Sequence, residues 1–340
     1  MKTIAVSLVS SPEHALAGHP EHPRRFAGLE NLLDGSEGAT LLRVPPVEDA
    51  RPSAARVHDG AYLERLQDAC RRAPALIDPA PTYVTRSSFE SALHAAGGAL
   101  AVLEAIHIGR AAAGIALVRP PGHHAPAGQA MGFCLLNNVA ITARAARDLG
   151  FRRILIVDFD VHHGNGTQAI TESDPDVLFV STHQGGIYPG TGHWLETGSG
   201  PGEGSVVNIP LPAGAGDAAF GLIASRVLAP LARRHRPDLL LVSAGFDAHW
   251  RDPLAGLQLT IGGYHRLVQD LISLAGEFAG GRIVFVTEGG YDPEVVTEGV
   301  SAILSGLADL PRFKDRLGPA PFSEPDVEEL LSRVAELHGV

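Results

Sequence analysis

The stretch Ile154-Leu-Ile-Val-Asp-Phe-Asp-Val-His-His163 passes directly from an apolar run into a cluster of acidic residues and histidines. Short runs rich in Val and Ile, apolar on both faces, are typical of strands buried inside a parallel sheet. Three further runs share this form: Ile115-Ala-Leu-Val before Arg119-Pro-Pro-Gly-His-His124, Leu239-Leu-Leu-Val before Ser243-Ala-Gly-Phe-Asp247, and Ile283-Val-Phe-Val before Thr287-Glu-Gly-Gly-Tyr291. Ligands of such sheets bind beyond the carboxyl ends of the strands. We therefore expect the four polar clusters to meet at one edge of one sheet.

Strands and helices are predicted to alternate along the chain. Residues 3–9 form a further expected strand, while residues 11–23 and the Pro-rich residues 74–81 are expected loops. Apolar spacing and composition predict helices over residues 24–33, 55–72, 87–110, 137–149, 218–234 and 263–278, with a closing helix in the tail that starts at Pro319. No linker divides the chain. The fold class we predict is therefore α/β, a three-layer sandwich with right-handed crossovers, formed as a single domain over residues 1–340.

Composition narrows the range of functions. The chain has 340 residues, 45% of them apolar, and a formal net charge of −11, which argues against general affinity for nucleic acid. Its two cysteines cannot make a thiolate zinc site, so a metal would have to be held by histidines and carboxylates. We expect a cytosolic, cytoplasmic protein with no cleaved signal peptide, because the apolar part of the N-terminus is short, and no membrane-spanning segment.

The strongest chemical signal is the spacing of Asp158, Asp160 and His162. Side chains alternate along a strand, so these three would share one face. Carboxylate and imidazole ligands suit zinc, and Asp247 from a neighbouring cluster would complete three protein ligands with a position left for water. An open site of this kind is catalytic. The alternative is that the acidic residues merely cap the helices that follow the strands.

The tandem histidines His123 and His124 follow a rigid Pro-Pro-Gly turn, and packing alone explains them poorly because both rings would need partners if buried. One of them is expected to act as a proton shuttle. Asp158 and Asn165 are the available acceptors for fixing the tautomer of these rings. Tyr291, on a turn with two glycines, can donate a hydrogen bond to an oxyanion, although a lone Tyr at a sheet edge would more often be a packing residue.

A glycine-rich loop is expected over residues 185–204, which hold eight glycines and two prolines. It is suited to shaping a pocket, and Tyr188 is its expected working residue. The oligomeric state stays open: the glycine-rich loops and residues 55–86 could pack against another subunit, so a homo-oligomer is possible.

Six stretches together resemble the zinc-dependent histone deacetylase family, in its class II-like form. They are Arg119-Pro-Pro-Gly-His-His, Gly132-Phe-Cys-Leu-Leu-Asn-Asn, Asp158-Phe-Asp-Val-His-His-Gly-Asn-Gly-Thr, Tyr188-Pro-Gly-Thr-Gly, Gly245-Phe-Asp-Ala-His and Glu288-Gly-Gly-Tyr. The resemblance runs from about His19 to about Gly306. It implies the arginase/deacetylase fold, with a parallel sheet of about eight strands between helices. It also implies zinc on Asp160, His162 and Asp247, with His123, His124 and Tyr291 as catalytic groups.

Further roles follow from the same resemblance alone. It implies a structural monovalent cation, usually K⁺, near Asp158, Asp160, His162, Ser181 and Thr182. It implies that Gly132, Phe133 and Tyr188 line an acyl-lysine tunnel. Arg25 matches an arginine beside an internal acetate cavity.

At three positions the residue indicates which subclass of the family, and which substrate, the chain resembles most. Asn165 stands where class I members carry Asp, so His124 has no carboxylate to polarise it there. Leu254 stands where polyamine-selective relatives carry a Glu, which argues against acetylpolyamines. Tyr291, rather than His, predicts activity on plain acetyl amides.

The expected function is a zinc-dependent deacetylase, a hydrolase that cleaves the acetyl group from N-acetyl-lysine side chains of proteins or peptides. One alternative is an amidohydrolase for small acetylated amines, such as acetylpolyamines or arylalkylamines. Another is a binding protein for acylated amines that keeps the fold without the reaction, which the presence of every expected site residue disfavours.

Overall fold

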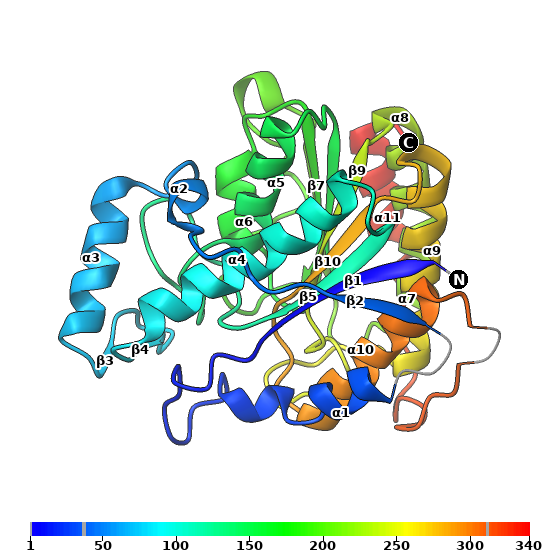
Figure 1. Cartoon of the computed structure of the whole chain (residues 1–340). Helices are drawn as coiled ribbons and strands as arrows, with labels where there is room; N and C mark the ends of the chain where they lie inside the picture. Colours follow the sequence, from blue (N-terminus) through cyan, green and yellow to red (C-terminus); the bar gives the residue numbers. More distant parts are fainter. Residues whose placement is uncertain (1, 36–38, 311–312) are drawn as a thin grey trace.

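One parallel sheet organises the molecule, as the computed structural model in Figure 1 shows. The structure describes residues 2–35, 39–310 and 313–340. The sheet has eight strands in the order β2-β1-β5-β10-β9-β6-β7-β8. Their bounds are β1 Thr3–Val9, β2 Thr40–Arg43, β5 Ala113–Val118, β6 Ile154–Asp158, β7 Val177–Gln184, β8 Val206–Leu211, β9 Leu239–Ala244 and β10 Ile283–Thr287. All neighbouring pairs are parallel, so all the strand ends that carry the polar clusters lie at the same edge.

Helices cover both faces of the sheet. Their bounds are α1 Leu29–Asp34, α2 Arg51–Ala54, α3 Gly60–Arg71, α4 Ser88–His107, α5 Asn138–Asp148, α6 Asn165–Thr171, α7 Asp217–Ile223, α8 Ala229–His235, α9 Ile261–Phe278, α10 Pro293–Leu307 and α11 Glu328–His338. On one face α4 and α5 pack against the strands, and on the other lie α7 to α11 with α1. The α/β sandwich and the sheet of eight parallel strands are therefore confirmed.

Residue alternation explains the two apolar cores. Leu155 and Val157 of β6 belong to the core under α9 and α10, whereas Ile154 and Ile156 belong to the core under α4 and α5. All four are buried. A strand with apolar side chains on both faces can satisfy both cores only in the interior of a layered sheet.

Five of the eight strands match the predicted runs, and three were not predicted. β7 begins with the buried apolar run Val177–Val180 followed by Ser181 and Thr182, a pattern like the others that the prediction missed, whereas β8 is interrupted by Asn208 and Pro210 and β2 is an edge strand with partly exposed side chains. The expected loop over residues 74–81 also contains a short strand, β3 Ala75–Leu76, which pairs antiparallel with β4 Tyr83–Val84.

Several helix bounds differ from the prediction. Residues 24–33 divide into a 3₁₀ turn, Pro23–Phe26, and α1, while the helix expected from Ala55 begins only at Gly60. The helix expected over residues 218–234 is interrupted by a π-helical turn at Ala224–Leu228, and the closing helix begins at Glu328 rather than near Pro319. Local propensity places helices well and their ends poorly.

The expectation that no segment approaches a membrane span was wrong for α4. By length and composition this helix, Ser88–His107, could cross a membrane, with a mean hydropathy of 1.2. In the fold, 83% of that apolar window is buried, and α4 packs against β1 and β5. Gly98 allows this packing, because a Cβ there would lie 3.0 Å from Val118 Cγ1 and 3.1 Å from Ser7 Oγ, and Gly97 allows close approach of the Val47 backbone, whose carbonyl oxygen would lie 2.9 Å from an added Cβ.

Candidate active site

Asp160, His162 and Asp247 converge beyond the carboxyl ends of β6 and β9. Each offers one ligand atom, and these atoms all lie within 4.8 Å of one another. His162 Nδ1 lies 3.3 Å from Asp160 Oδ1 and 3.3 Å from Asp247 Oδ2. Both carboxylates are buried, and the imidazole is nearly so, with a 13% exposed side chain. The adjacency predicted from distant parts of the sequence is present.

Backbone N–H groups orient these two carboxylates but leave one carboxylate oxygen without a hydrogen bond. Gly289 N donates to Asp160 Oδ2 over 2.8 Å, and Val161 N donates to Asp247 Oδ1 over 2.9 Å. Asp247 Oδ2, in contrast, is buried without a hydrogen-bond partner among the described residues. A buried carboxylate oxygen without a donor is costly unless a cation neutralises it. The residues present therefore fit a divalent metal held by two carboxylates and one imidazole.

Two glycines make room for these carboxylates. A Cβ on Gly289 would lie 2.0 Å from Asp247 Oδ2, and a Cβ on Gly245 would lie 2.2 Å from Asp160 Oδ2. No other residue type would fit at either position without moving a candidate ligand. The glycines that follow β9 and β10 are thus part of the site.

The strand geometry proposed for Asp158, Asp160 and His162 was wrong in one respect. The strand β6 ends at Asp158, and residues 160–162 form bends rather than a continuation of the strand. Asp160 N donates to Asp158 Oδ1, and His162 N donates to Asp160 Oδ1. These turns toward the preceding carboxylates, rather than strand alternation, bring the side chains together.

The two tandem histidines have different partners. His123 Nδ1 donates to Asp158 Oδ2 over 3.0 Å, and although burial disfavours its charge, Asp160 and Asp158 raise the pKa of His123 well above its ordinary value. His124 Nδ1 lies 2.7 Å from Asn165 Oδ1. Burial, reinforced by the two neighbouring imidazoles, lowers the pKa of His124 well below its ordinary value.

The Asn165 amide defines the tautomer of His124. Its Nδ2 points to the His124 carbonyl oxygen, which leaves Oδ1 as the acceptor for Nδ1–H. His124 Nε2 is consequently the unprotonated nitrogen. The structure therefore brings together His123, His124, Asp158 and Asn165 as the sequence predicts.

Tyr291 follows the glycine turn after β10 and lies against two predicted site residues. Its ring centroid lies 5.8 Å from that of Phe133 in an edge-to-face arrangement, and the guanidinium carbon of Arg25 lies 4.8 Å from it. Its backbone N donates to Asp252 Oδ2 over 2.7 Å. Burial raises the pKa of Tyr291 well above its ordinary value, so its hydroxyl keeps its proton.

Gly132 and Tyr188 lie against His124. The Tyr188 and His124 ring centroids are 5.1 Å apart, and a Cβ on Gly132 would lie 2.4 Å from His124 Cδ2. Gly132 and Phe133 both have positive φ angles, +56° and +70°. Leu254, by contrast, is 39% exposed.

The remaining predicted residues lie at the end of β6 and β7. Ser181 is the register partner of Asp158, and its hydroxyl lies 2.9 Å from His183 Nδ1. Thr182 Oγ1 donates to the Asp158 carbonyl oxygen over 3.2 Å. These side chains are therefore next to the acidic cluster, on its strand side.

Several site residues were not predicted. Glu288 accepts hydrogen bonds from Gly122 N and His123 N, and together with His123 and Cys134 it forms a second group of buried ligand-type atoms within 4.8 Å. Asp78 accepts from Gly132 N and from Thr82 Oγ1, whose oxygen in turn accepts from Phe133 N. A lone acidic residue in a loop carries no periodic signal, so only tertiary contacts identify these roles.

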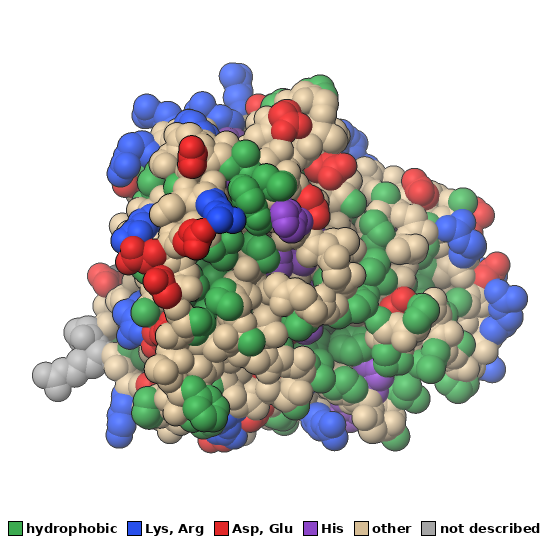
Figure 2. All heavy atoms as spheres, turned by 180° about the vertical axis from the view of Figure 1, so that it is seen from behind, with side chains coloured by type: hydrophobic (Ala, Val, Ile, Leu, Met, Phe, Trp, Pro, Cys, Tyr) green, Lys and Arg blue, Asp and Glu red, His purple; other side chains and the backbone are tan. Residues whose placement is uncertain are grey.

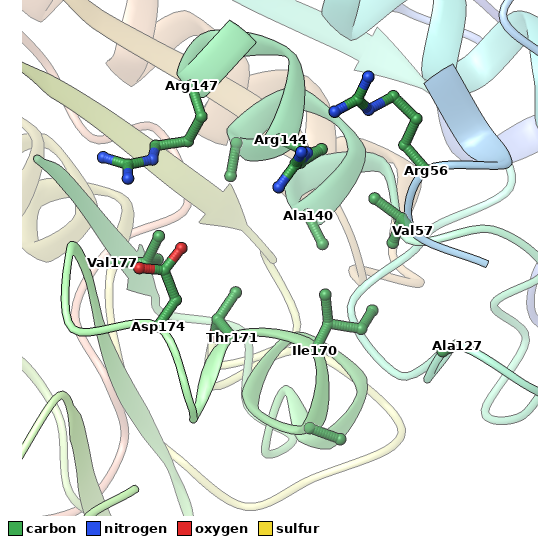
Figure 3. Close-up of a pocket in the computed structure, with 12 residues that line it drawn as sticks. Arg56, Val57, Ala127, Ala140, Arg144, Arg147, Ile170, Thr171, Asp174 and Val177 are labelled. Carbon is green, nitrogen blue, oxygen red and sulfur yellow. The ribbon is translucent and has the colours of Figure 1, made fainter. Parts of the chain in front are cut away.

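Figure 2 shows one face of the molecule, and Figure 3 a cavity apart from the candidate site. On the face shown in Figure 2, histidine side chains lie near the middle, partly covered by hydrophobic and uncharged groups, and most charged side chains lie further out. A separate cavity of about 290 Å³ lies between α5 and α6 (Figure 3) and contains none of the predicted site residues. Arg56, Arg144 and Arg147 form one wall of this α5–α6 cavity, opposite Ile170, Thr171 and Asp174.

Comparison with known proteins places the chain among the histone deacetylases. The Histone deacetylase domain family matches residues 19–307. Histone deacetylase 14, chloroplastic, from Arabidopsis thaliana is 43% identical over 85% of this chain and 72% of its own. A histone deacetylase-like amidohydrolase from Pseudomonas aeruginosa is 39% identical over 87% of this chain and 80% of its own. The crystal structure of the HDA15 HD domain superposes with a TM-score of 0.89 at 33% identity, covering 99% of this chain and 94% of that one.

Proposed function

The chain belongs to the histone deacetylase family, and from that premise we propose that it is a zinc-dependent deacetylase acting on N-acetyl-lysine in proteins or peptides. The observation that carries the proposal is the group Asp160, His162 and Asp247, in which Asp247 Oδ2 accepts no hydrogen bond from the described residues and faces His162 Nδ1 at 3.3 Å. Zinc held there would supply a Lewis acid for the amide carbonyl and would lower the pKa of a bound water.

His124 is the proposed general base. Asn165 holds the proton on Nδ1, so Nε2 is free to accept a proton from the attacking water and later to deliver it to the leaving amine. The lowered pKa of His124 keeps it neutral at pH 7, the form a base requires. His123, paired with Asp158, is the proposed positive partner beside it.

Tyr291 is the proposed oxyanion donor. Its raised pKa keeps the hydroxyl protonated, and the flanking Arg25 and Phe133 hold the ring. A hydroxyl placed this way stabilises negative charge as it develops on the carbonyl oxygen.

The residues that are proposed to line the substrate tunnel suggest which acetylated amine the enzyme prefers. Gly132, Phe133 and Tyr188 would line a narrow arm for the lysine side chain, and Arg25 would lie at the inner end beside the released acetate. Leu254 offers no negative charge to attract a cationic polyamine, which favours acetyl-lysine over acetylpolyamines.

A monovalent cation, K⁺ as the family resemblance implies, is proposed beside the acidic cluster, near Asp158, Asp160, His162, Ser181 and Thr182. The contact between Thr182 and the Asp158 carbonyl supports this placement. Unfolding midpoints measured in K⁺, Na⁺ and choline chloride test it: K⁺ should give the highest midpoint, and equal midpoints would contradict it.

The deciding experiment couples metal analysis to a substrate panel. The purified protein should cleave an acetyl-lysine peptide faster than acetylated polyamines or arylalkylamines under identical conditions, and chelation should abolish cleavage until zinc is restored. Preference for a small acetylated amine would replace the substrate class and keep the reaction. Cleavage of none of these amides by zinc-loaded protein would refute the proposal.

A further inference from the structure

Glu21 is a fully buried carboxylate in the loop after β1 that reaches two separate parts of the active site. It is 0% exposed, and its partners Arg25 and Arg119 are 1% and 0% exposed. Arg119 Nε donates to Glu21 Oε1 and Arg119 Nη2 to Glu21 Oε2, each over 2.7 Å. Arg25 Nη1 donates to Glu21 Oε1 over 3.1 Å. One carboxylate therefore joins two buried guanidinium groups, an arrangement expensive to bury unless every donor is satisfied.

The Arg119 arm leads to the tandem histidines. Arg119 immediately precedes the Pro120-Pro121-Gly122 turn that carries His123 and His124. Its remaining donors reach the carbonyl oxygens of Ser10, Ser11 and His14. All five N–H groups of this side chain thus have acceptors, so its position is determined by the loop that contains Glu21.

The Arg25 arm leads to Tyr291. Arg25 Nε donates to the Gly290 carbonyl oxygen over 2.5 Å, and Nη2 donates to the Glu288 carbonyl oxygen. The same guanidinium lies against the Tyr291 ring. Gly290 has φ +111°, a backbone conformation that side-chain-bearing residues rarely adopt, so the turn depends on external bonds to hold its shape.

We propose that Glu21 is a positioning residue, which sets the distance between the His124 loop and the Tyr291 turn by holding Arg119 and Arg25 at once. Glu21 touches no reacting atom. It acts through the two arginines, and its own place is secured by Tyr83, whose hydroxyl lies 3.2 Å from Glu21 Oε2, and by His14 at 3.4 Å. The assignment of catalytic roles to His124 and Tyr291 rests on the proposed function.

The simpler account is that Glu21 only stabilises the fold, like any buried ion pair. That account predicts a general loss of stability from its removal, with no special relation to Tyr291. Loss of positioning predicts a fall in kcat with KM nearly unchanged, because misplacing a catalytic group by about 1 Å can cost about 100-fold in rate.

The test combines amide hydrogen exchange with a double-mutant cycle. Glu21→Gln should speed exchange of the amides in residues 119–124 and 288–291, and should lower kcat about 10-fold to 100-fold on an acetyl-lysine peptide. In a Tyr291→Phe background the same change should cost clearly less than in the wild type, because only the His124 loop is then left for the loss of Glu21 to displace. Glu324→Gln is the control: its carboxylate accepts from Gly216, Ala218 and Ala219 N–H groups, outside both loops.

Arg25→Lys is the second variant, for use if Glu21→Gln does not fold. It keeps the charge pair with Glu21 but cannot bond both carbonyl oxygens of the Tyr291 turn, so exchange should rise over residues 288–291 alone. The inference is overturned if exchange in these loops is unchanged, or if the Glu21 and Tyr291 effects multiply. Exchange is measured without substrate, so a wild-type protein that cleaves no amide would sink the proposed function and leave this inference to be judged by exchange alone.

Discussion

The candidate active site and the α5–α6 cavity differ in how their charges are matched. In the cavity, Arg56 and Arg144 lie 3.1 Å and 3.8 Å from the same Asp148 carboxylate, and Arg147 lies 2.7 Å from Asp176. These pairs are partly exposed, so solvent screens them. In the site, by contrast, two carboxylates and an imidazole face one another away from solvent, and Asp247 Oδ2 has no donor among the described residues. Open volume alone therefore does not identify the functional region, whereas the convergence of buried ligand-type side chains on one point does.

Gly289→Ala should produce the largest loss of activity, because the added methyl group would displace two candidate zinc ligands without replacing either. The new Cβ would lie 2.0 Å from Asp247 Oδ2 and 2.6 Å from Asp160 Oδ2. Displacing these carboxylates should weaken zinc binding and lower activity by at least about 10-fold to 100-fold. Zinc affinity from competition with a fluorescent chelator measures the change.

Gly276→Ala is the matched control, since a Cβ there meets no atom within 4 Å and the position lies inside α9. Alanine should stabilise that helix by about 0.5–1 kcal/mol and leave zinc binding as it was. Equal zinc affinity in both alanine variants would mean that the glycine cradle has no part in holding metal.

The site could be predicted from the sequence wherever a polar residue with a chemical role directly follows an apolar strand. The runs before Asp158, Asp247 and Tyr291 are apolar on both faces, so their place inside a parallel sheet, and hence the meeting of their polar ends, could be predicted. The bends at residues 160–162 could not, because the backbone there follows hydrogen bonds to carboxylates rather than a repeating pattern.

Acid should weaken the fold on the cavity side, where no metal is expected to protect it. His58 Nε2 accepts a hydrogen bond from Asn137 N at the start of α5, and burial lowers the pKa of His58 from 6.5 to about 4. Between these values the unfolded chain binds a proton that the folded chain does not, so stability falls as pH drops from about 6.5 to about 4. The slope is up to about 1.4 kcal/mol per pH unit for this group, about 3 kcal/mol in total.

His58→Gln should flatten this dependence, because its amide oxygen can still accept from Asn137 and does not titrate. Urea unfolding at a series of pH values, with zinc present throughout, measures the two slopes. Identical slopes in wild type and variant would show that His58 is not responsible.

Arg147→Gln should have the smallest effect. It removes a half-buried ion pair with Asp176 on the wall of the α5–α6 cavity, so unfolding free energy should change by less than about 1 kcal/mol and deacetylation should stay at its wild-type rate. If Arg147→Gln lowered activity, the α5–α6 cavity would have a functional role, and the distinction drawn between it and the candidate active site would be wrong.

Glu21, Glu288 and Asp78 show why the rest of the site escaped prediction. Each lies in an irregular segment, and each acts by bonding backbone or guanidinium groups distant in sequence. Glu288 directly follows β10, inside the polar stretch Thr287–Tyr291, so its position carries a local pattern but its bonds to Gly122 and His123 do not. Glu21 and Asp78 follow no such strand, and only the folded structure identifies their partners.

Anomalous X-ray diffraction at the zinc edge, on crystals grown with zinc, tests the central claim most directly. The account predicts a single strong peak within bonding distance of Asp160, His162 and Asp247, and its loss in the Asp247→Asn variant. A peak instead among His123, Cys134 and Glu288, the other buried group of ligand-type atoms, or no peak at either place, would contradict it.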